Sequence, residues 1–386
     1  MKRSKALSIL IPTKNRAHYL PHAIQSALNI ASDEIEVIVS ENHGGDNALE
    51  LARSFADSRL TVIQPAEPLP MHDHWEYLLS KSTGDWVTFL GDDDAILPTA
   101  LYTMKRIEAS HPFIEAIYSA RAYFFWPNDI DSFGELKFPL LDQISIDDSK
   151  DTLNKILTGQ LYYCYTPQIY SGGFQRRSLI RRIVNARGRY FYSAVPDAAS
   201  ALNALLFTTH FARIGLPLTI VGTSPNRKQT SDSRLAKDRE ADFFGALSNS
   251  SVEIHPIVND VPFTGMAMSF LETYLSAAPL ISLKEVDQDF IFPTVCRSII
   301  DHLQSNRPEL ALSMAKHVGV SMPTEQEIQN YLLMYPCIIP DPAAGSVVFS
   351  SNSNSGCKTI SDAVKAIVET FRDFQGNSAN HVSMIF

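Results

Sequence analysis

The sequence predicts an α/β protein built on a mostly parallel, doubly wound sheet. Short apolar, β-branched runs alternate with helical periodicity through about the first hundred of the 386 residues. Polar clusters also follow three of the predicted strands. Ligands in this architecture bind beyond the carboxyl ends of the strands. We therefore expect one crevice to be lined by the clusters Thr13–Arg16, Glu41–Gly45 and Asp92–Asp94.

The first half of the chain supplies the elements in a regular order. Apolar runs predict strands over residues 7–11, 37–39, 60–63 and 86–90. Apolar spacing of three and four predicts helices that carry Leu20–Leu28, Leu49–Phe55, Trp75–Leu79 and Leu101–Ile107. We expect Asp46 to cap the second helix, and Pro98 suits the first turn of the fourth.

Beyond residue 110 the pattern is less regular. Aromatic-rich stretches come first, and a helical pattern resumes in PDAASALNALLF and again near the end of the chain. The polar segment SDSRLAKDREAD indicates a boundary near residue 235. We therefore expect a large domain over residues 1–235 and a smaller, mainly α-helical region over 236–386, whose role the sequence does not assign.

Composition excludes several classes of protein. A net charge of −9 argues against wholesale binding to nucleic acid. No apolar run approaches the length of a membrane span. The cysteines are far apart and lack the spacing of a disulfide framework or a zinc site, so we expect reduced thiols and a cytoplasmic protein. They are Cys164, Cys296, Cys337 and Cys357.

Three segments carry a resemblance to a known family. In order and spacing, LSILIPTKNR, EVIVSENHGGD and GDWVTFLGDDDAILP resemble the signature segments of the family 2 glycosyltransferases, which have the GT-A fold. The likeness extends more weakly through SGGFQRRSL and VPDAASAL. It implies that residues 1–100 bind a nucleotide sugar and that 101–235 hold the acceptor side and the catalytic base.

The acidic triplet fits this family because a donor diphosphate cannot lie beside carboxylates without a divalent cation between them. Oxygen ligands select Mg²⁺ or Mn²⁺. By resemblance to the D-x-D pattern, Asp94 faces the metal and Asp92 faces the donor ribose and assists at the metal, while Asp93 is a further donor-side candidate. The alternative is a solvated turn in which Asp94 caps a helix.

The first two clusters are expected to contact the nucleotide. By resemblance the candidates are Pro12, Thr13, Asn15, Arg16, Glu41 and Asn42. Glu41 stands where many relatives read uracil with an aspartate, and a carboxylate there can accept the imide N–H. Glu41 is one methylene longer than that aspartate, and Asn42 replaces a frequent second acid. With these departures UDP is still favoured, and other nucleotides stay open. The alternative for Thr13, Asn15 and Asn42 is loop capping.

Further candidates lie outside these clusters. The resemblance places His74 at the donor pocket, and it places Arg227 and Lys228 on a loop that closes over the diphosphate; a plain surface loop is the alternative. In the densest basic run, Arg177 and Arg181 share a helix face. That face could contact an anionic lipid-linked acceptor or the inner face of a membrane, or it could simply be solvated.

Asp197 is the candidate catalytic base. In relatives a carboxylate opens a helix after the Gly-Gly segment, and Val195-Pro196-Asp197 stands there in this chain. A simple helix cap is the alternative. The resemblance implies transfer of a sugar, with inversion, from a nucleotide-diphosphate donor, most simply a UDP-sugar, to a hydroxyl of a saccharide or lipid-linked acceptor.

The implied role is surface polysaccharide or other glycan biosynthesis. A sugar-1-phosphate nucleotidyltransferase remains an alternative, although PTKNRAHYL lacks the Gly-rich loop such enzymes carry. A non-catalytic nucleotide- or glycan-binding module is the other alternative. The sequence leaves the oligomeric state open.

Overall fold

The computed structural model describes most of the first 224 residues and several later segments. The ranges are 5–127, 134–157, 160–224, 273–274, 276–277, 311–312, 315, 322, 324–334, 346–349 and 357–377. The expected boundary near residue 235 lies outside them.

The first strands and helices form βα units whose strands run parallel. The strands are β1 (Leu7–Thr13), β2 (Ile35–Glu41), β3 (Leu60–Ile63) and β4 (Trp86–Phe89), in the spatial order β3-β2-β1-β4. The connecting helices are α1 (Leu20–Leu28), α2 (Ala48–Arg53) and α3 (Met71–Ser80). Each unit agrees with the alternation in the sequence, so this part of the predicted fold is confirmed.

The sheet continues beyond β4 with mixed strand directions. The short β9 (Gly173–Arg176) is antiparallel to both β4 and β6 (Ala116–Phe125), and β10 (His210–Thr223) runs parallel to β6. Along β10 lie β5 (Ala95–Ile96) and β8 (Ile144–Asp148), and β7 (Leu136–Pro139) pairs with β6. The helical elements are α4 (Ala100–Ser110), α5 (Ser149–Leu157), the 3₁₀ turn η1 (Tyr163–Tyr165), α6 (Arg177–Arg187) and α7 (Pro196–Phe207).

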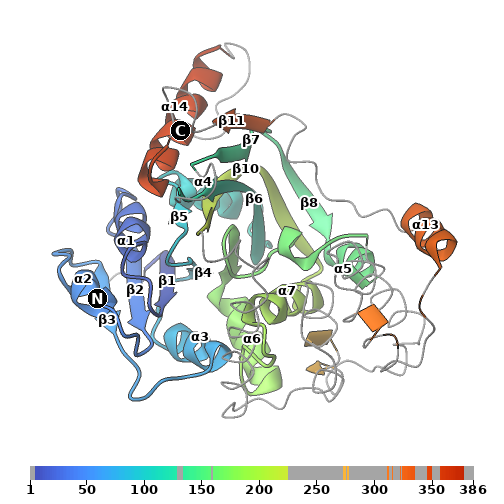
Figure 1. Cartoon of the computed structure of the whole chain (residues 1–386), viewed down its shortest axis with the longest axis horizontal. Helices are drawn as coiled ribbons and strands as arrows, with labels where there is room; N and C mark the ends of the chain where they lie inside the picture. The colour runs from blue at the N-terminus through green and yellow to red at the C-terminus, as the bar shows by residue number, and fades with distance from the viewer. Residues whose placement is uncertain are drawn as a thin grey trace.

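Helices cover both faces of the sheet (Figure 1). Side chains alternate along β1, so Ile9 enters a core with α1, α2 and α4, whereas Leu10 enters a second core with α3, α6 and α7. The strands are buried on both faces, which explains their nearly continuous apolar sequence. The predicted α/β sheet flanked by helices is therefore confirmed.

The last described elements join this body. β11 (Ser346–Phe349) pairs antiparallel with β7, and α14 (Ile360–Asn377) packs its apolar side on α1, β5 and β10. Ile360 and Ile367 of α14 are fully buried in the same core as β1. The helix α13 (Glu325–Met334) precedes β11 and α14 in the chain. In the part of the chain that is described, no helix is both long and apolar enough to cross a membrane.

Candidate functional site

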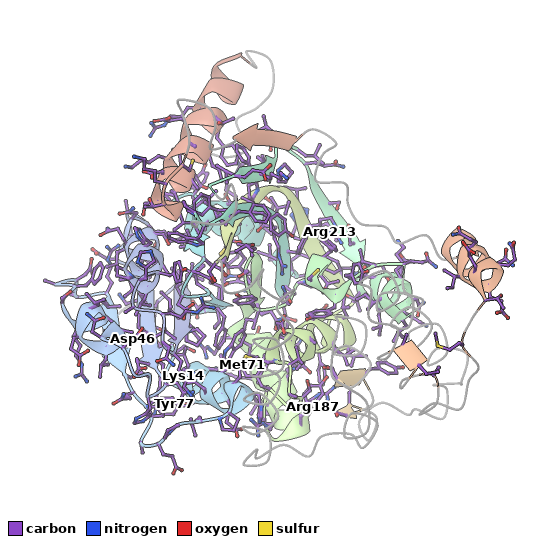
Figure 2. The ribbon with its side chains drawn as sticks, viewed as in Figure 1. Lys14, Asp46, Met71, Tyr77, Arg187 and Arg213 are labelled. Carbon is purple, nitrogen blue, oxygen red and sulfur yellow. The ribbon has the colours of Figure 1, made fainter. Side chains whose placement is uncertain are left out.

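The loops after β1 and β2 are tied together at the edge where the strand order reverses. Asn42 donates its backbone N–H to the carbonyl of Thr13 at 2.9 Å, and Gly45 N–H donates to Oδ1 of Asn15 at 2.6 Å. Asn15 has a φ of +58°, a conformation that asparagine tolerates better than most residues. Figure 2 shows Lys14 and Asp46 on these two loops. Two of the three predicted clusters are therefore brought together.

Glu41 and Asn42 are both buried and both bonded within the protein. The Glu41 carboxylate accepts hydrogen bonds from the backbone N–H groups of His43 and Gly44 and from Nε2 of Gln64. The Asn42 amide donates to the carbonyl of Leu69 at 2.8 Å and accepts from its N–H at 2.9 Å. Asn42 therefore shapes the loop before α3 with its whole side-chain amide, in line with the loop-capping alternative.

The acidic triplet follows β4, and its third member is fully enclosed. Oδ1 of Asp94 accepts from the Gly222 N–H at 2.8 Å, and Oδ2 accepts from the Gly91 N–H at 3.1 Å. Oδ2 also accepts a hydrogen bond from the Ser171 hydroxyl. Asp94 is not a helix cap as the alternative reading had it, since α4 begins at Ala100 after Thr99 at the cap position. The carboxylate instead joins the end of β4 to β10 and to the segment before β9.

Asp92 is the member of the triplet that meets the first cluster. Nε of Arg16 lies 3.8 Å from Oδ1 of Asp92, and Arg16 also donates to the Ser224 hydroxyl at 2.9 Å. Burial, and next the charge of Asp93, raise the pKa of the Asp92 carboxyl to about 7, although Arg16 and Thr13 act in the opposite direction. All three predicted clusters therefore converge, and Arg16, the cation of the first cluster that pairs with Asp92, only partly offsets the acidic charge.

The acidic triplet has the chemistry of a candidate cation site. Within the part of the chain that the structure describes, Oδ2 of the buried Asp93 has no hydrogen-bond partner, and a buried carboxylate oxygen without a partner is costly. Neighbouring carboxylates of this kind are oxygen ligands that suit Mg²⁺ or Mn²⁺. Among the described residues, no group of three or more His, Cys, Asp or Glu could hold a metal by itself. A cation here would need further oxygen ligands, which a diphosphate can provide.

Close packing of β10 against the triplet was not evident from the sequence. A Cβ on Gly222 would lie 1.7 Å from the carbonyl oxygen of Asp93, so only glycine fits. The same carbonyl accepts a hydrogen bond from Nε1 of Trp126 at 3.0 Å. In the sequence, the glycine that ends LPLTIVG is the only trace of this contact.

His74 lies behind the site. Its side chain is buried, and Nε2 lies 2.8 Å from the hydroxyl of Ser40 on β2. Burial, and next the charge of Lys14, lower the pKa of His74 to about 4, so the ring is neutral. Pro12, for its part, lies on β1 opposite Ser40. His74 is therefore placed to fix the end of β2.

Asp197 lies in the first turn of α7, whose cap position is taken by Val195. The Tyr163 hydroxyl donates to Oδ2 of Asp197 at 3.2 Å. Burial raises the pKa of the carboxyl, whereas the bond from Tyr163 and the charge of Arg121 lower it. A half-buried carboxylate with a raised pKa is a candidate general base.

Of the remaining candidates, some lie outside the described residues and the others form hydrogen bonds within the protein. Arg227 and Lys228 lie outside the described residues. Arg177 donates to the Gly84 carbonyl at 3.1 Å and to the Ser82 hydroxyl at 2.8 Å, so much of its charge is used within the fold. Its neighbour Arg182 pairs with Glu115 at 2.6 Å. The basic run therefore helps to attach α6 to the rest of the protein.

Part of the chain is similar in sequence to known glycosyltransferases. Residues 8–132 match the model of the family described as glycosyl transferase family 2. A GalNAc(5)-diNAcBac-PP-undecaprenol beta-1,3-glucosyltransferase of Campylobacter jejuni is 32% identical over 104 residues, which are 26% of this chain and 33% of that protein. A PGL/p-HBAD biosynthesis glycosyltransferase of Mycobacterium tuberculosis is 29% identical over 105 residues, which are 26% of this chain and 40% of that protein.

The aligned segments therefore span well under half the length of these curated relatives. Among solved structures, S. aureus TarS 1-349 in complex with UDP-GlcNAc has a TM-score of 0.46 and 14% identity to this chain. That alignment covers 82% of this chain and 93% of the solved one.

Proposed function

Because the chain carries a glycosyl transferase family 2 domain over residues 8–132, we propose that it transfers a sugar from a UDP-sugar donor to a hydroxyl of a saccharide or lipid-linked acceptor, with inversion. The observation that carries the proposal is the convergence of three polar clusters at the ends of β1, β2 and β4, at the crevice where α/β sheets bind ligands.

On the donor side we assign the nucleotide to the loops after β1 and β2. The nucleotide site would be lined from below by Pro12, Thr13 and Asn15. Arg16 would contact the diphosphate. Glu41 still has acceptor capacity beyond its three internal hydrogen bonds, since a carboxylate offers about four lone-pair sites. It can therefore accept the imide N–H of uracil, while Asn42 and His74 hold the loop and strand behind it.

We assign the metal to the acidic triplet. Asp92, the more exposed member, and Asp94 would hold Mn²⁺ or Mg²⁺, and Asp93 would add negative charge beside it. The cation supplies charge neutralisation for the diphosphate when bound. The unpartnered Oδ2 of Asp93 and the raised pKa of Asp92 support this assignment, since both are features of carboxylates crowded without a counter-charge. Arg227 and Lys228 are proposed to approach the same diphosphate.

Asp197 is proposed as the base of a single displacement. The acceptor oxygen forms a bond to the anomeric carbon while the bond from that carbon to the diphosphate oxygen breaks. The electron pair of the broken bond leaves with UDP, and the proton of the acceptor hydroxyl passes to the Asp197 carboxylate. Tyr163 stabilises that carboxylate through its hydrogen bond.

The name of one relative supports a proposal for the class of acceptor. The Campylobacter protein is named for a glycan on undecaprenyl diphosphate, and this favours a lipid-linked acceptor in surface-glycan biosynthesis. A cytoplasmic location at the inner face of the membrane would suit such an acceptor. The exposed Arg181 side of α6 is a candidate contact with it.

A donor screen tests the proposal. The full chain is incubated with Mn²⁺ and a panel of UDP-, GDP- and dTDP-sugars, and free nucleotide, pyrophosphate and sugar 1-phosphate are measured. We expect one UDP-sugar to release UDP, with EDTA abolishing the release. Release of pyrophosphate from UTP and a sugar 1-phosphate would instead identify a nucleotidyltransferase. Nucleotide binding without turnover, even with acceptor extracts, would identify a binding module.

A further inference from the structure

Arg121, on β6 opposite Thr219 of β10, is a partly buried cation with an open hydrogen-bonding edge. Its Nε and Nη2 atoms are buried and have no hydrogen-bond partner among the described residues. No carboxylate of the described residues forms an ion pair with it. Burying guanidinium nitrogens without partners is costly, so the position calls for a compensating anion.

The carboxylate of Asp197 interacts with the charge of Arg121 only from beyond ion-pair distance, and the phenols around Arg121 do not provide an anion. The phenol of Tyr123 interacts with the guanidinium, but burial raises the pKa of Tyr123, and burial likewise raises the pKa of Tyr118. Both phenols are therefore neutral. Cys164 and Tyr170 are the other titratable groups whose charges act on Arg121. The aromatic side chains around Arg121 favour an arginine at this position, but as neutral groups they do not balance its charge.

The charge of Arg121 acts on residues in both halves of the candidate site. Its charge acts on Asp197 and on Tyr170. The Tyr170 hydroxyl lies only 2.8 Å from the position that a Cβ on Gly91 would take, directly before the acidic triplet. The guanidinium is therefore near the carboxylate that would activate the acceptor and near the residues that would hold the donor diphosphate.

We propose that Arg121 binds an anionic group of the glycan substrate, a carboxylate or a phosphate, beside Asp197. The free Nε and Nη2 atoms form one edge of the guanidinium, and this edge matches two oxygens of a carboxylate or phosphate in a bidentate contact. The anion belongs either to the donor sugar, as a uronic-acid carboxylate, or to the acceptor. This inference rests on the proposed function and specifies its substrate class.

A stability comparison tests whether Arg121 has a structural role instead. Arg213, on β10 (Figure 2), is the matched control. Its Nε donates to Asp147 at 2.5 Å, and its guanidinium lies over the ring of Tyr118. We expect Arg213→Met to lower the Tm by at least about 4 °C, since it removes a paired group. Arg121→Met should leave the Tm within about 2 °C of the parent or raise it. A loss as large as that of Arg213→Met would overturn the proposal.

Binding measurements then identify the source of the anion. In one arm, calorimetry with Mn²⁺ compares UDP-glucuronate with UDP-glucose on the full chain. In the other arm, UDP-saturated protein is titrated with glycerol 3-phosphate and with glycerol. We expect the anionic ligand of one arm to bind at least about tenfold more tightly than its neutral partner, a difference of about 1.4 kcal/mol.

The Arg121 variants complete the test. Arg121→Met should abolish the preference, Arg121→Lys should keep part of it, and both should bind UDP as the parent does. The proposal is overturned if neither arm shows a preference or if the preference survives in Arg121→Met. Failure of the parent protein to bind UDP at all would instead overturn the proposed function, so the two failures are distinguishable.

Discussion

The phenol of Tyr163 donates a hydrogen bond to Oδ2 of Asp197, with 3.2 Å between the two oxygens. The bond joins η1 to the first turn of α7, and it stabilises the ionised carboxylate against the burial that raises its pKa. Because a general base must be ionised to accept a proton, this contact and the charge of Arg121 would both extend to lower pH the range in which Asp197 could act as the proposed base.

Asp197→Asn is expected to lower kcat by at least about a hundredfold, since a general base contributes roughly 10²–10⁴ in rate. In contrast to kcat, the stability of the variant relative to the parent should increase as pH rises. The folded pKa of Asp197 is raised, so its contribution to stability is full at low pH and is lost as pH rises through that pKa. The Tm of Asp197→Asn relative to the parent should therefore improve with rising pH. Near-normal turnover would remove Asp197 from the mechanism.

Tyr163→Phe removes the hydrogen bond that lowers the pKa of Asp197. The pKa of Asp197 should rise, so the acid limb of the kcat profile should move to higher pH while the plateau rate changes less. The measurement is kcat against pH for both proteins at saturating donor. An acid limb in the same place as the parent's would show that another group controls it.

Asp92 and Asp94 are expected to respond differently to substitution. Asp94 is fully buried and accepts three hydrogen bonds, and each buried donor left unsatisfied costs about 1–3 kcal/mol. Asp94→Ala should therefore lose at least about 2 kcal/mol in urea unfolding. Asp92→Asn should keep the parent's stability and lose the enhancement of UDP binding by Mn²⁺. A variant of Asp92 with intact Mn²⁺-dependent binding would contradict the metal assignment.

Gly44 and Gly45 are neighbouring positions at which substitution by alanine should have different effects. A Cβ on Gly44 would lie 2.8 Å from the backbone nitrogen and Oδ1 of Asn15 and from Oε1 of Glu41, whereas the nearest atom to a Cβ on Gly45 is 3.9 Å away. Gly44→Ala should destabilise the protein by about 1–3 kcal/mol and weaken UDP binding at least about tenfold. Gly45→Ala should stay within about 0.5 kcal/mol of the parent. Equal effects in calorimetry and urea unfolding would contradict the assignment of this loop.

Ile367 tests how the end of the chain contributes to the catalytic body. It is fully buried in the core shared with α1 and β1, while Lys365 on the same helix is exposed. Ile367→Ala should cost about 2–5 kcal/mol, and the loss should appear in the same unfolding transition that UDP stabilises. Lys365→Ala is expected to be nearly neutral. A separate transition for Ile367→Ala would mean that α14 unfolds independently.

The sequence by itself determined the first four strands, their helices and the convergence of the polar clusters. Local patterns suffice there, since each βα unit is formed by neighbours in the chain and parallel strands bring their carboxyl ends to one edge. β1 and β2, for example, end at Thr13 and Glu41, within two residues of where the apolar runs end.

The tertiary structure decided which polar residues are free to act. Asp94, which is expected to face a metal, also accepts hydrogen bonds from Gly222, Gly91 and Ser171, and no local pattern encodes partners up to 128 positions away. Arg121 carried no signal in the sequence, because the open edge of its guanidinium depends on what the fold places around it and not on its neighbours in the chain. Hydrogen bonding and desolvation depend on groups that only folding brings together, so burial and charge balance cannot be predicted from spacing along the chain.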